Sequence, residues 1–396
     1  MKRISELEKK YVLEALDNEF NTSKNSIFNN RMEKKFTELM NCKYAIGHVN
    51  GTATMHTALA ALGVKAGDEV IVPPLTMSST AFAVLHNNSI PVFSDVDKET
   101  FNINPDSIKD KITSKTKAII TVSLYGLSPD YDKILSICKQ NNLFLIEDNA
   151  ECFLGKYKGK IVGEFGDFSS FSFQASKHLT CGDGGMLTTN NENFANEARR
   201  FCGLGYAGVS AKQGKITRSD IQDPQYSRHV SLGFNYRMSE ITAAVVLGQL
   251  ERAQELVDIR IKTAKIFDNV INNDNNKLLI RQAEPEGYVN SYWSYSMILN
   301  TPNPETDWYK FRDLFLKNGG DGYYAAWKLS YMEPLFQNII QHWNGVWQKY
   351  EKGLCPVAEY LQPRMIQLKT NYWNLNEAEQ QAEILSKTIK EYQNLA

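Results

Sequence analysis

The sequence has 396 residues, of which 42% are hydrophobic and 11% aromatic, so it can bury a substantial core and form one large and one smaller domain. Its 44 Lys and Arg residues nearly balance its 45 Asp and Glu residues, and the formal net charge of −1 predicts no general attraction to nucleic acid or to a membrane surface. No apolar run approaches the length that spans a bilayer. The six cysteines show no CxxC pair and no metal-type spacing, which indicates reduced thiols in a cytoplasm and no metal site.

The first part of the chain predicts two helices and then a turn suited to phosphate. Residues 1–16 place apolar side chains at helical spacing among many charges, which is typical of an amphipathic helix and not of a signal peptide. A second amphipathic helix is expected over residues 32–40. In residues 43–63 a strand leads through a tight turn into a helix, and Gly51 and Thr52 stand where the helix begins. Free N–H groups beside a hydroxyl can hold a phosphate there, although a threonine that merely caps the helix is the commoner arrangement.

The next hundred residues alternate between strands and helices. Residues 67–97 predict strand, loop, helix and strand, and residues 116–126 predict a further buried strand. A helix then leads into residues 143–151, an apolar run that delivers Asp148 to its carboxyl end. This alternation predicts a mainly parallel sheet with helices on both faces. Ligands of such sheets bind at the carboxyl ends of the strands, which is where Asp148 lies.

The most informative lysine follows a strand whose phenylalanines and serines alternate over residues 168–173. Lys177 comes next, and a glycine-rich turn leads into a second strand over residues 186–189. Most lysines are solvated surface groups. Partial burial between two strands would instead free the amine for Schiff-base chemistry. A carboxylate, Asp148, precedes it by 177 − 148 = 29 positions. Pyridoxal 5'-phosphate (PLP) needs both groups, an amine for its aldehyde and an anion for its ring nitrogen.

Several motifs in the same order resemble one known family, the DegT/StrS family of PLP-dependent sugar aminotransferases. The similarity covers roughly the first two thirds of the chain and weakens after about Arg260. The strings that carry it are VNGTATMHTALAALG, GDEVIVPPLT, IEDNAE, FSFQASKHLTCGDGGM and GFNYRMSEITAAVVLGQLER. The resemblance implies an α/β protein of the PLP-transferase fold type I. We therefore expect a large domain over residues 1–260, with a mainly parallel seven-stranded sheet between helices, and a small α+β domain over residues 261–396.

The resemblance also implies an activity. Members move an amino group from L-glutamate or L-glutamine to a keto sugar, here expected to be nucleotide-linked, in amino-sugar and surface-polysaccharide biosynthesis. By this resemblance Lys177 carries the cofactor and transfers the proton, and Asp148 stabilises the ring nitrogen. In the family Gly51, Thr52 and Ser172 match residues that hold the cofactor phosphate.

Three further positions follow from the same resemblance. Asn235 matches an asparagine that reaches across a homodimer to the partner's cofactor phosphate, so two copies would share their sites. Met77 stands where relatives place an aromatic residue that stacks on the cofactor ring, and a thioether can also pack against an aromatic face. Glu151 stands where relatives carry His, Gln or Glu, and the Glu version resembles the group that acts on nucleotide-linked 4-keto-6-deoxyhexoses.

Other functions remain open at this point. Related sugar dehydratases replace the reacting lysine with histidine, whereas this chain keeps Lys177 and has His178 beside it, for which no chemical role is expected. A keto-inositol or a small ketose phosphate fits the same residues as a keto sugar. A sensor that has lost catalysis is disfavoured because Asp148 and Lys177 are both present.

The remainder of the chain predicts a cover and a second domain. The polar residues 211–229 are expected to form a loop over the site, and residues 233–260 a loop followed by one long helix. An aromatic-rich strand is expected over residues 288–300, and a charged amphipathic helix at the end of the chain. Between them lies an aromatic run that could stack on a sugar or base, although packing is commoner, and it contains Tyr323, Tyr324, Trp327 and Tyr331.

Overall fold

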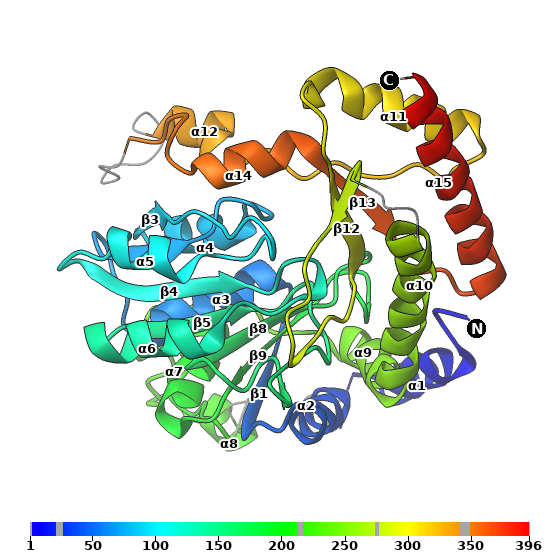
Figure 1. Cartoon of the computed structure of the whole chain (residues 1–396). Helices are drawn as coiled ribbons and strands as arrows, with labels where there is room; N and C mark the ends of the chain where they lie inside the picture. Colours follow the sequence, from blue (N-terminus) through cyan, green and yellow to red (C-terminus); the bar gives the residue numbers. More distant parts are fainter. Residues whose placement is uncertain (1, 21–26, 213–216, 274–276, 340–348, 396) are drawn as a thin grey trace.

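A mainly parallel sheet of seven strands forms the centre of the computed structural model, which describes residues 2–20, 27–212, 217–273, 277–339 and 349–395 (Figure 1). The strands lie in the order β1-β9-β8-β5-β4-β2-β3; β9 is antiparallel to both neighbours and the other pairs are parallel. They are β1 (Tyr44–His48), β2 (Glu69–Val72), β3 (Ile90–Phe93), β4 (Thr116–Val122), β5 (Phe144–Asp148), β8 (Phe168–Ser172) and β9 (Gly185–Thr189).

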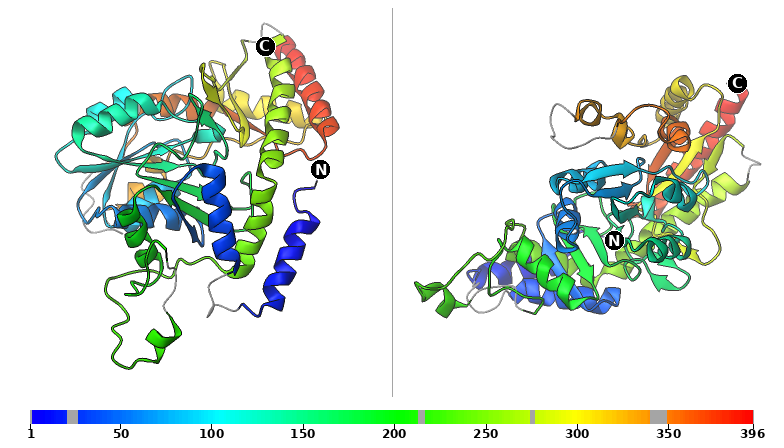
Figure 2. Two further views of the ribbon diagram at one scale, coloured as in Figure 1. Left: turned by 90° about the horizontal axis from the view of Figure 1, so that it is seen from below. Right: turned by 90° about the vertical axis from the view of Figure 1, so that its left-hand side faces the viewer.

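Helices cover both faces of this sheet, as the two views of Figure 2 show. Ile119 and Ile120 of β4 and Leu145 and Ile146 of β5 are almost completely buried, because side chains on both faces of a covered sheet pack against helices. The predicted layers are therefore confirmed. The helices of this part are α2 (Ile27–Met40), α3 (Gly51–Ala61), α4 (Ser79–His86), α5 (Pro105–Lys111), α6 (Tyr131–Asn141), α7 (Glu192–Cys202), α9 (Glu240–Glu251) and the turn η2 (Leu124–Gly126).

The ends of the predicted helices differ in places from the structure. The first helix, α1 (Glu6–Asp17), is preceded by the N-cap residue Ser5, and the side chains of Ser5 and Glu8 each accept from the other's backbone N–H. The second helix begins at Ile27 and is thus longer than predicted. The single long helix predicted after residue 233 is broken at Arg252 into α9 and α10 (Ala253–Asn273). At the break, the Arg252 guanidinium turns to Glu8 and to the carbonyl of Lys2.

A second, antiparallel sheet of three strands lies beside the first, in the order β10-β12-β13. Helices α10 and α15 pack together along it, and α15 also packs against α11 (Figure 1). We call this part the small-sheet region. Its remaining elements are β10 (Leu279–Arg281), β12 (Ser294–Leu299), α11 (Pro304–Lys317), η4 (Gln362–Arg364), β13 (Met365–Lys369) and α15 (Leu375–Leu395). Between α11 and η4 the chain also forms η3 (Ser330–Met332), α12 (Pro334–Gln337) and α14 (Pro356–Leu361), and α12 and α14 lie over β3 and α4 of the central part (Figure 1). A third small sheet joins β11 (Tyr288–Val289), β6 (Lys156–Tyr157) and β7 (Lys160–Ile161).

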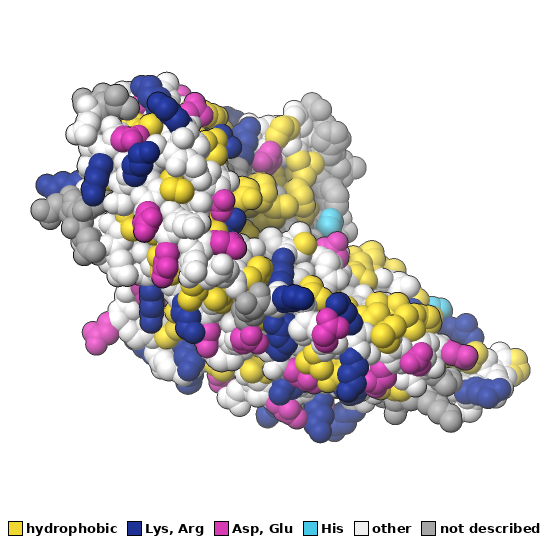
Figure 3. All heavy atoms as spheres, turned by 90° about the vertical axis from the view of Figure 1, so that its right-hand side faces the viewer, with side chains coloured by type: hydrophobic (Ala, Val, Ile, Leu, Met, Phe, Trp, Pro, Cys, Tyr) yellow, Lys and Arg dark blue, Asp and Glu magenta, His cyan; other side chains and the backbone are white. Residues whose placement is uncertain are grey.

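Residues 203–235, which contain the short helix α8 (Arg218–Gln222), project from the body as an arm (Figure 2). Figure 3 shows this projection with hydrophobic side chains on its surface. The sequence predicts that residues 211–229 form a loop over the site; in this chain the arm projects from the body, so it does not cover the central sheet of the same copy (Figure 2). Residues 213–216 lie outside the described part. Among the described residues, no helix combines the length and the apolar character needed to cross a bilayer.

Candidate active site

The loop that carries Lys177 joins two neighbouring strands, as the sequence predicted. β8 and β9 pair directly, and the loop leaves the sheet at Phe173, whose N–H donates to the carbonyl of Gly184 at 2.8 Å. Within the loop the N–H of Lys177 donates to the carbonyl of Gln174 at 3.0 Å. The loop therefore starts from a fixed strand end and holds its lysine by main-chain hydrogen bonds.

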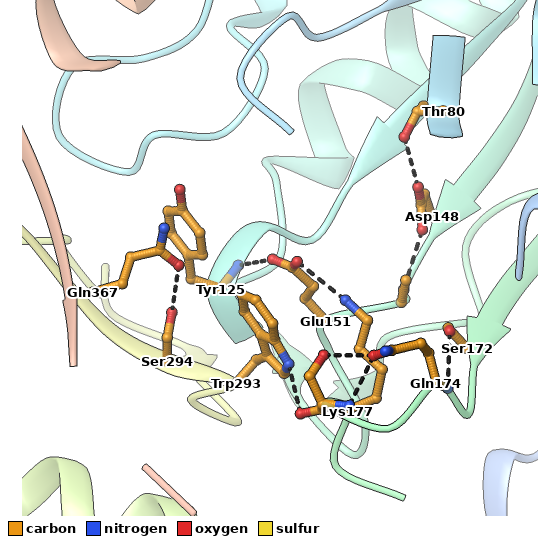
Figure 4. A network of polar contacts seen from close by, with 12 residues as sticks. Thr80, Tyr125, Asp148, Glu151, Ser172, Gln174, Lys177, Trp293, Ser294 and Gln367 are labelled. Carbon is orange, nitrogen blue, oxygen red and sulfur yellow. Dashed lines mark hydrogen bonds and ion pairs between the residues drawn. The ribbon is translucent and has the colours of Figure 1, made fainter. Parts of the chain in front are cut away.

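The amine of Lys177 lies between a carboxylate and an aromatic ring (Figure 4). Its Nζ is 3.2 Å from Oε1 of Glu151 and 4.4 Å from the centre of the Trp293 ring. Only 14% of the Lys177 side chain and 6% of the Glu151 side chain are exposed, so solvent screens this ion pair little. A cation is attracted to the face of an indole as well as to the carboxylate. The two contacts together fix where the amine points.

Glu151 is itself held by the backbone. Its Oε2 accepts a hydrogen bond from the N–H of Tyr125 at 3.1 Å. Tyr125 has φ +61°, a conformation that side chains other than glycine rarely adopt, and it aims that N–H at the carboxylate. The Tyr125 ring stacks on Trp293 with centroids 6.3 Å apart. One strained residue thus supports both neighbours of the lysine amine.

Asp148 ends β5 and is buried, as predicted. Its Oδ2 accepts a hydrogen bond from the Thr80 hydroxyl at 2.8 Å, and its Oδ1 accepts one from the N–H of Ala150 at 3.2 Å. Burial raises the pKa of Asp148 above its usual range, and these two hydrogen bonds oppose part of the rise. No ion pair holds this carboxylate within the described part of the chain, so it can receive a cationic ring nitrogen.

The start of α3 has the form of a phosphate seat. The Asn50 side chain caps the helix by accepting from the N–H of Ala53, which leaves the first-turn N–H groups of Gly51 and Thr52 without intrahelical acceptors. A Cβ at Gly51 would lie 3.1 Å from the Cβ of Ser172, so glycine permits this close approach. The structure therefore brings Gly51, Thr52 and Ser172 together, and these groups fit a phosphate.

Asn235 and Met77, two further predicted cofactor contacts, are both exposed in this chain. Asn235 is exposed on the arm, where its side chain accepts from Nε of Arg237 at 2.9 Å, and no contact described for it reaches Lys177 or Asp148 of the same chain. Met77 lies just before α4 and is 49% exposed. Its neighbour Ser78 donates to the Ser330 hydroxyl at 3.2 Å, so the Met77 loop is tied to the aromatic run.

His178 follows Lys177 in the chain and contacts a segment far away in the sequence. It is buried, and its Nε2 lies 2.9 Å from the carbonyl oxygen of Ser291. Burial lowers the pKa of His178 well below its usual range, so the ring is neutral and donates to that carbonyl. This hydrogen bond accounts for the histidine as a structural group; its lack of a chemical role stays a prediction.

Sequence reasoning missed three residues at this site: Thr80, Trp293 and Arg260. Thr80 stands in the first turn of a helix that follows a strand, which is a weak signal in the sequence for a contact with the site. Trp293 and Arg260 lie where the resemblance to a known family weakens, and only long-range contacts bring them to Lys177. The aromatic run divides: Tyr323 and Tyr331 are packed in the interior, whereas Tyr324 and Trp327 are 70% and 55% exposed.

Comparison with known proteins identifies relatives over almost the whole chain. The model of the DegT/DnrJ/EryC1/StrS aminotransferase family matches residues 2–387. The GDP-perosamine synthase of Escherichia coli O157:H7 is 38% identical over 362 residues, which cover 91% of this chain and 89% of the relative. The GDP-perosamine synthase of Caulobacter vibrioides is 36% identical over a stretch that covers 75% of this chain and 76% of the relative.

Comparison with solved structures leads to the same family. The aminotransferase from Psychrobacter cryohalolentis superposes with a TM-score of 0.86 at 27% identity, covering 99% of this chain and 98% of that one. Both the predicted fold and the predicted enzyme class are thereby confirmed. The chain belongs to the DegT/DnrJ/EryC1/StrS aminotransferase family and is a PLP-dependent transaminase.

Proposed function

We propose that this enzyme transfers an amino group from L-glutamate or L-glutamine to a nucleotide-linked keto sugar, in amino-sugar and surface-polysaccharide biosynthesis in the cytoplasm. The similarity to two GDP-perosamine synthases supports a sugar acceptor carried by GDP. Glu151 is compatible with this acceptor, because its position resembles that of relatives acting on 4-keto-6-deoxyhexoses. A GDP-linked 4-keto-6-deoxyhexose is therefore the acceptor we propose first.

The observation that carries the proposal is the amine of Lys177, 3.2 Å from Glu151, in a site that also contains the buried carboxylate of Asp148. When bound, PLP supplies an aldehyde that takes up an amine and a ring that accepts electrons. Lys177 is the residue that would hold it covalently. Asp148 would face the ring nitrogen, where its negative charge favours the protonated ring.

Lys177 has a second task once its Nζ is free. A free lysine amine can take a proton from one atom of a bound substrate and deliver it to another, and the ion pair with Glu151 holds the amine in place. The indole of Trp293 limits how far the amine can swing, since its ring centre lies 4.4 Å from Nζ. We therefore propose Lys177 as the acid and base of the transfer, with Glu151 as its partner.

The phosphate of the cofactor would lie at the start of α3. Gly51 and Thr52 offer two N–H groups, and the Ser172 hydroxyl lies beside them. We assign the remaining contact to Asn235 of a second copy, because Asn235 is exposed on the arm and does not contact the site of its own chain. Met77 would pack against the cofactor ring through its thioether.

We further propose a homodimer with shared sites. Large apolar side chains are exposed on the arm at Val230, Leu232 and Phe234, and exposed apolar groups that lie close together are typical of a protein interface. The division into domains at residue 260 also remains a proposal, with the small-sheet region as the second domain; this boundary falls within α10.

Trapping the cofactor and assaying transfer tests the function. Wild-type enzyme, reduced with borohydride in excess PLP, should carry one cofactor on Lys177 by peptide mass spectrometry. Lys177→Ala should not carry this label, and its kcat for 2-oxoglutarate release from glutamate should be lower by at least ~10³-fold. Lys160→Ala, at an exposed lysine of β7, should behave as wild type.

The acceptor series should contain GDP- and UDP-linked 4-keto-6-deoxyhexoses, a keto-inositol and a ketose phosphate. An amino sugar as product supports transfer, and a deoxy sugar would show dehydration instead. Normal turnover by Lys177→Ala would disprove the assignment.

A further inference from the structure

Arg260 is the largest side chain that is fully buried in the described structure, and it lies on α10 with no carboxylate partner among the described residues. Burying a charged group without an opposite charge is costly unless hydrogen bonds replace the lost water. Burial lowers the pKa of Arg260 to about 9, so the guanidinium still carries its charge at neutral pH. Such a residue needs an explanation from its contacts.

Four hydrogen bonds from Arg260 join two parts of the chain. One terminal nitrogen, Nη2, donates to the carbonyls of Ser176 and Lys177, each at 3.2 Å. The other, Nη1, donates to the carbonyl of Trp293 at 2.8 Å and to the hydroxyl of Thr370 at 3.0 Å. The first pair lies in the loop of the reacting lysine. The second pair lies at the near ends of β12 and β13, in the small-sheet region.

Trp293 completes a closed ring of contacts. Its indole N–H donates to the Ser176 carbonyl at 3.0 Å, while the face of the same ring lies 4.4 Å from Nζ of Lys177 (Figure 4). Thr370 also donates to the carbonyl of Tyr292 at 2.7 Å, which fixes the turn that presents the indole. The main chain of Lys177 and the group that faces its amine are therefore held by the same guanidinium.

Only a planar fork of donors meets this geometry. Arg260 reaches four acceptors on two sides, whereas the ammonium of a lysine has three donors at one point. Arg3 also donates to the Lys177 carbonyl, at 2.9 Å, but it comes from the N-terminal segment and makes no described contact with Trp293 or Thr370. Arg3 therefore supports the lysine loop without joining it to the small-sheet region.

We propose that Arg260 is a positioning residue for transamination: it joins the loop of Lys177 to the Trp293 turn and so sets where the amine stands between Glu151 and the indole. This inference rests on the proposed role of Lys177 as the reacting lysine. Because a displacement of about 1 Å in a reacting group can cost about 10²-fold in rate, the effect should fall on turnover more than on substrate binding.

The test compares Arg260→Lys with Arg199→Lys. Arg199, on α7 of the central part of the fold, is also an arginine with low exposure. It pairs with Glu33 and donates to the carbonyl of Ala45, and it makes no described contact with the Lys177 loop. Both variants keep the positive charge and lose the planar set of guanidinium N–H donors. We measure Tm, kcat and KM for the keto sugar, and the yield of cofactor trapped on Lys177 by borohydride at saturating PLP.

We expect Arg260→Lys to lower kcat by ~10- to 100-fold with KM changed by less than ~3-fold, and to lower the yield of trapped cofactor, while Arg199→Lys lowers Tm with kcat near that of wild type. Equal losses of kcat in the two variants would overturn the proposal. Should Arg260→Lys fail to fold, Thr370→Val decides: a several-fold loss of kcat at normal Tm supports the proposal, and an unchanged kcat overturns it.

The same experiment separates the two levels of inference. Wild-type cofactor trapped on a lysine other than Lys177 would refute the proposed function and with it the role of Arg260. Cofactor trapped on Lys177, together with a normal kcat in Arg260→Lys, would refute the positioning role alone.

Discussion

The lysine loop and the arm differ in how many of their side chains find partners within a single copy of the chain. Around Lys177 the charged and polar groups have partners within the chain: Glu151 has the amine and a backbone N–H, and Asp148 has two donors. The arm, residues 203–235, also pairs its main chain, for example from the N–H of Val230 to the carbonyl of Gly205 at 2.8 Å. Yet Leu232 on the arm is 82% exposed.

This difference indicates which part of the enzyme is complete in one copy. The lysine and the carboxylates are positioned by contacts inside the chain, so a single copy can hold them in place. The arm holds its own backbone but leaves apolar side chains in water, which costs free energy unless another surface covers them. A second copy would cover the arm and receive Asn235 at its phosphate seat.

The largest expected effect at the self-contained site is that of Asp148→Asn. Loss of the negative charge should lower kcat by ~10²- to 10³-fold. Since burial raises the folded pKa of Asp148 above its unfolded value, the stability from this group is present below the unfolded pKa and is lost as pH rises through the folded pKa. At neutral pH without cofactor, the variant should therefore have a higher Tm than wild type, measured by calorimetry.

Asp167→Asn is the matched control for that variant. Asp167 is also a carboxylate whose pKa burial raises, but it accepts from the N–H of Leu145 at the opposite end of the strands. It should keep a normal kcat. If Asp148→Asn turned over as fast as this control, the assignment of Asp148 to the ring nitrogen would be wrong.

On the arm, Leu232→Asp should separate the two copies. Placing a charge in an apolar interface should raise the dimer Kd by about 10²-fold or more. Light scattering after size exclusion measures the mass, and kcat should fall with the dimer fraction because, in the proposed dimer, Asn235 of the partner subunit would no longer reach the phosphate. Leu13→Asp, at a leucine of α1 that is also exposed, serves as the control. A variant that stays dimeric would show that the arm is not the interface.

The smallest expected effect concerns pH at the base of the arm. The ring of His56 on α3 lies 5.1 Å from those of Phe201 and Phe234, and its Nδ1 lies 3.2 Å from the Tyr236 hydroxyl. Burial, and then the charge of His86, lowers the pKa of His56 to about 4. A depressed folded pKa means that stability is present above the unfolded value near 6.5 and is lost as pH falls toward 4.

Wild-type Tm should therefore fall between pH 7 and pH 5, and the fall should be about 2 °C smaller in His56→Gln. Scanning fluorimetry at the two pH values measures the difference. Equal falls in the two proteins would show that His56 does not contribute to the acid sensitivity of the arm.

Much of the site could be predicted because its residues follow strands. Asp148 ends β5 and Lys177 follows β8, and the alternation of strands and helices places both at one edge of a parallel sheet. The turn at Gly51 could be predicted for the same reason, since a strand and a helix flank it directly. The spacing of apolar residues, the positions of glycines and the order of the elements contain this information, because each of these features is set by residues close together in the sequence.

The resemblance of the sequence to a known family predicted the class of enzyme, and its strand pattern predicted the mainly parallel sheet and the placement of Lys177, Asp148 and the turn at Gly51. The tertiary structure alone places the Trp293 ring at the amine and Arg260 at the lysine loop, because Arg260 and Lys177 lie 83 positions apart and Trp293 and Ser176 lie 117 positions apart. It also decided the direction of the arm. No local pattern records such contacts; packing of the small-sheet region against the central sheet creates them.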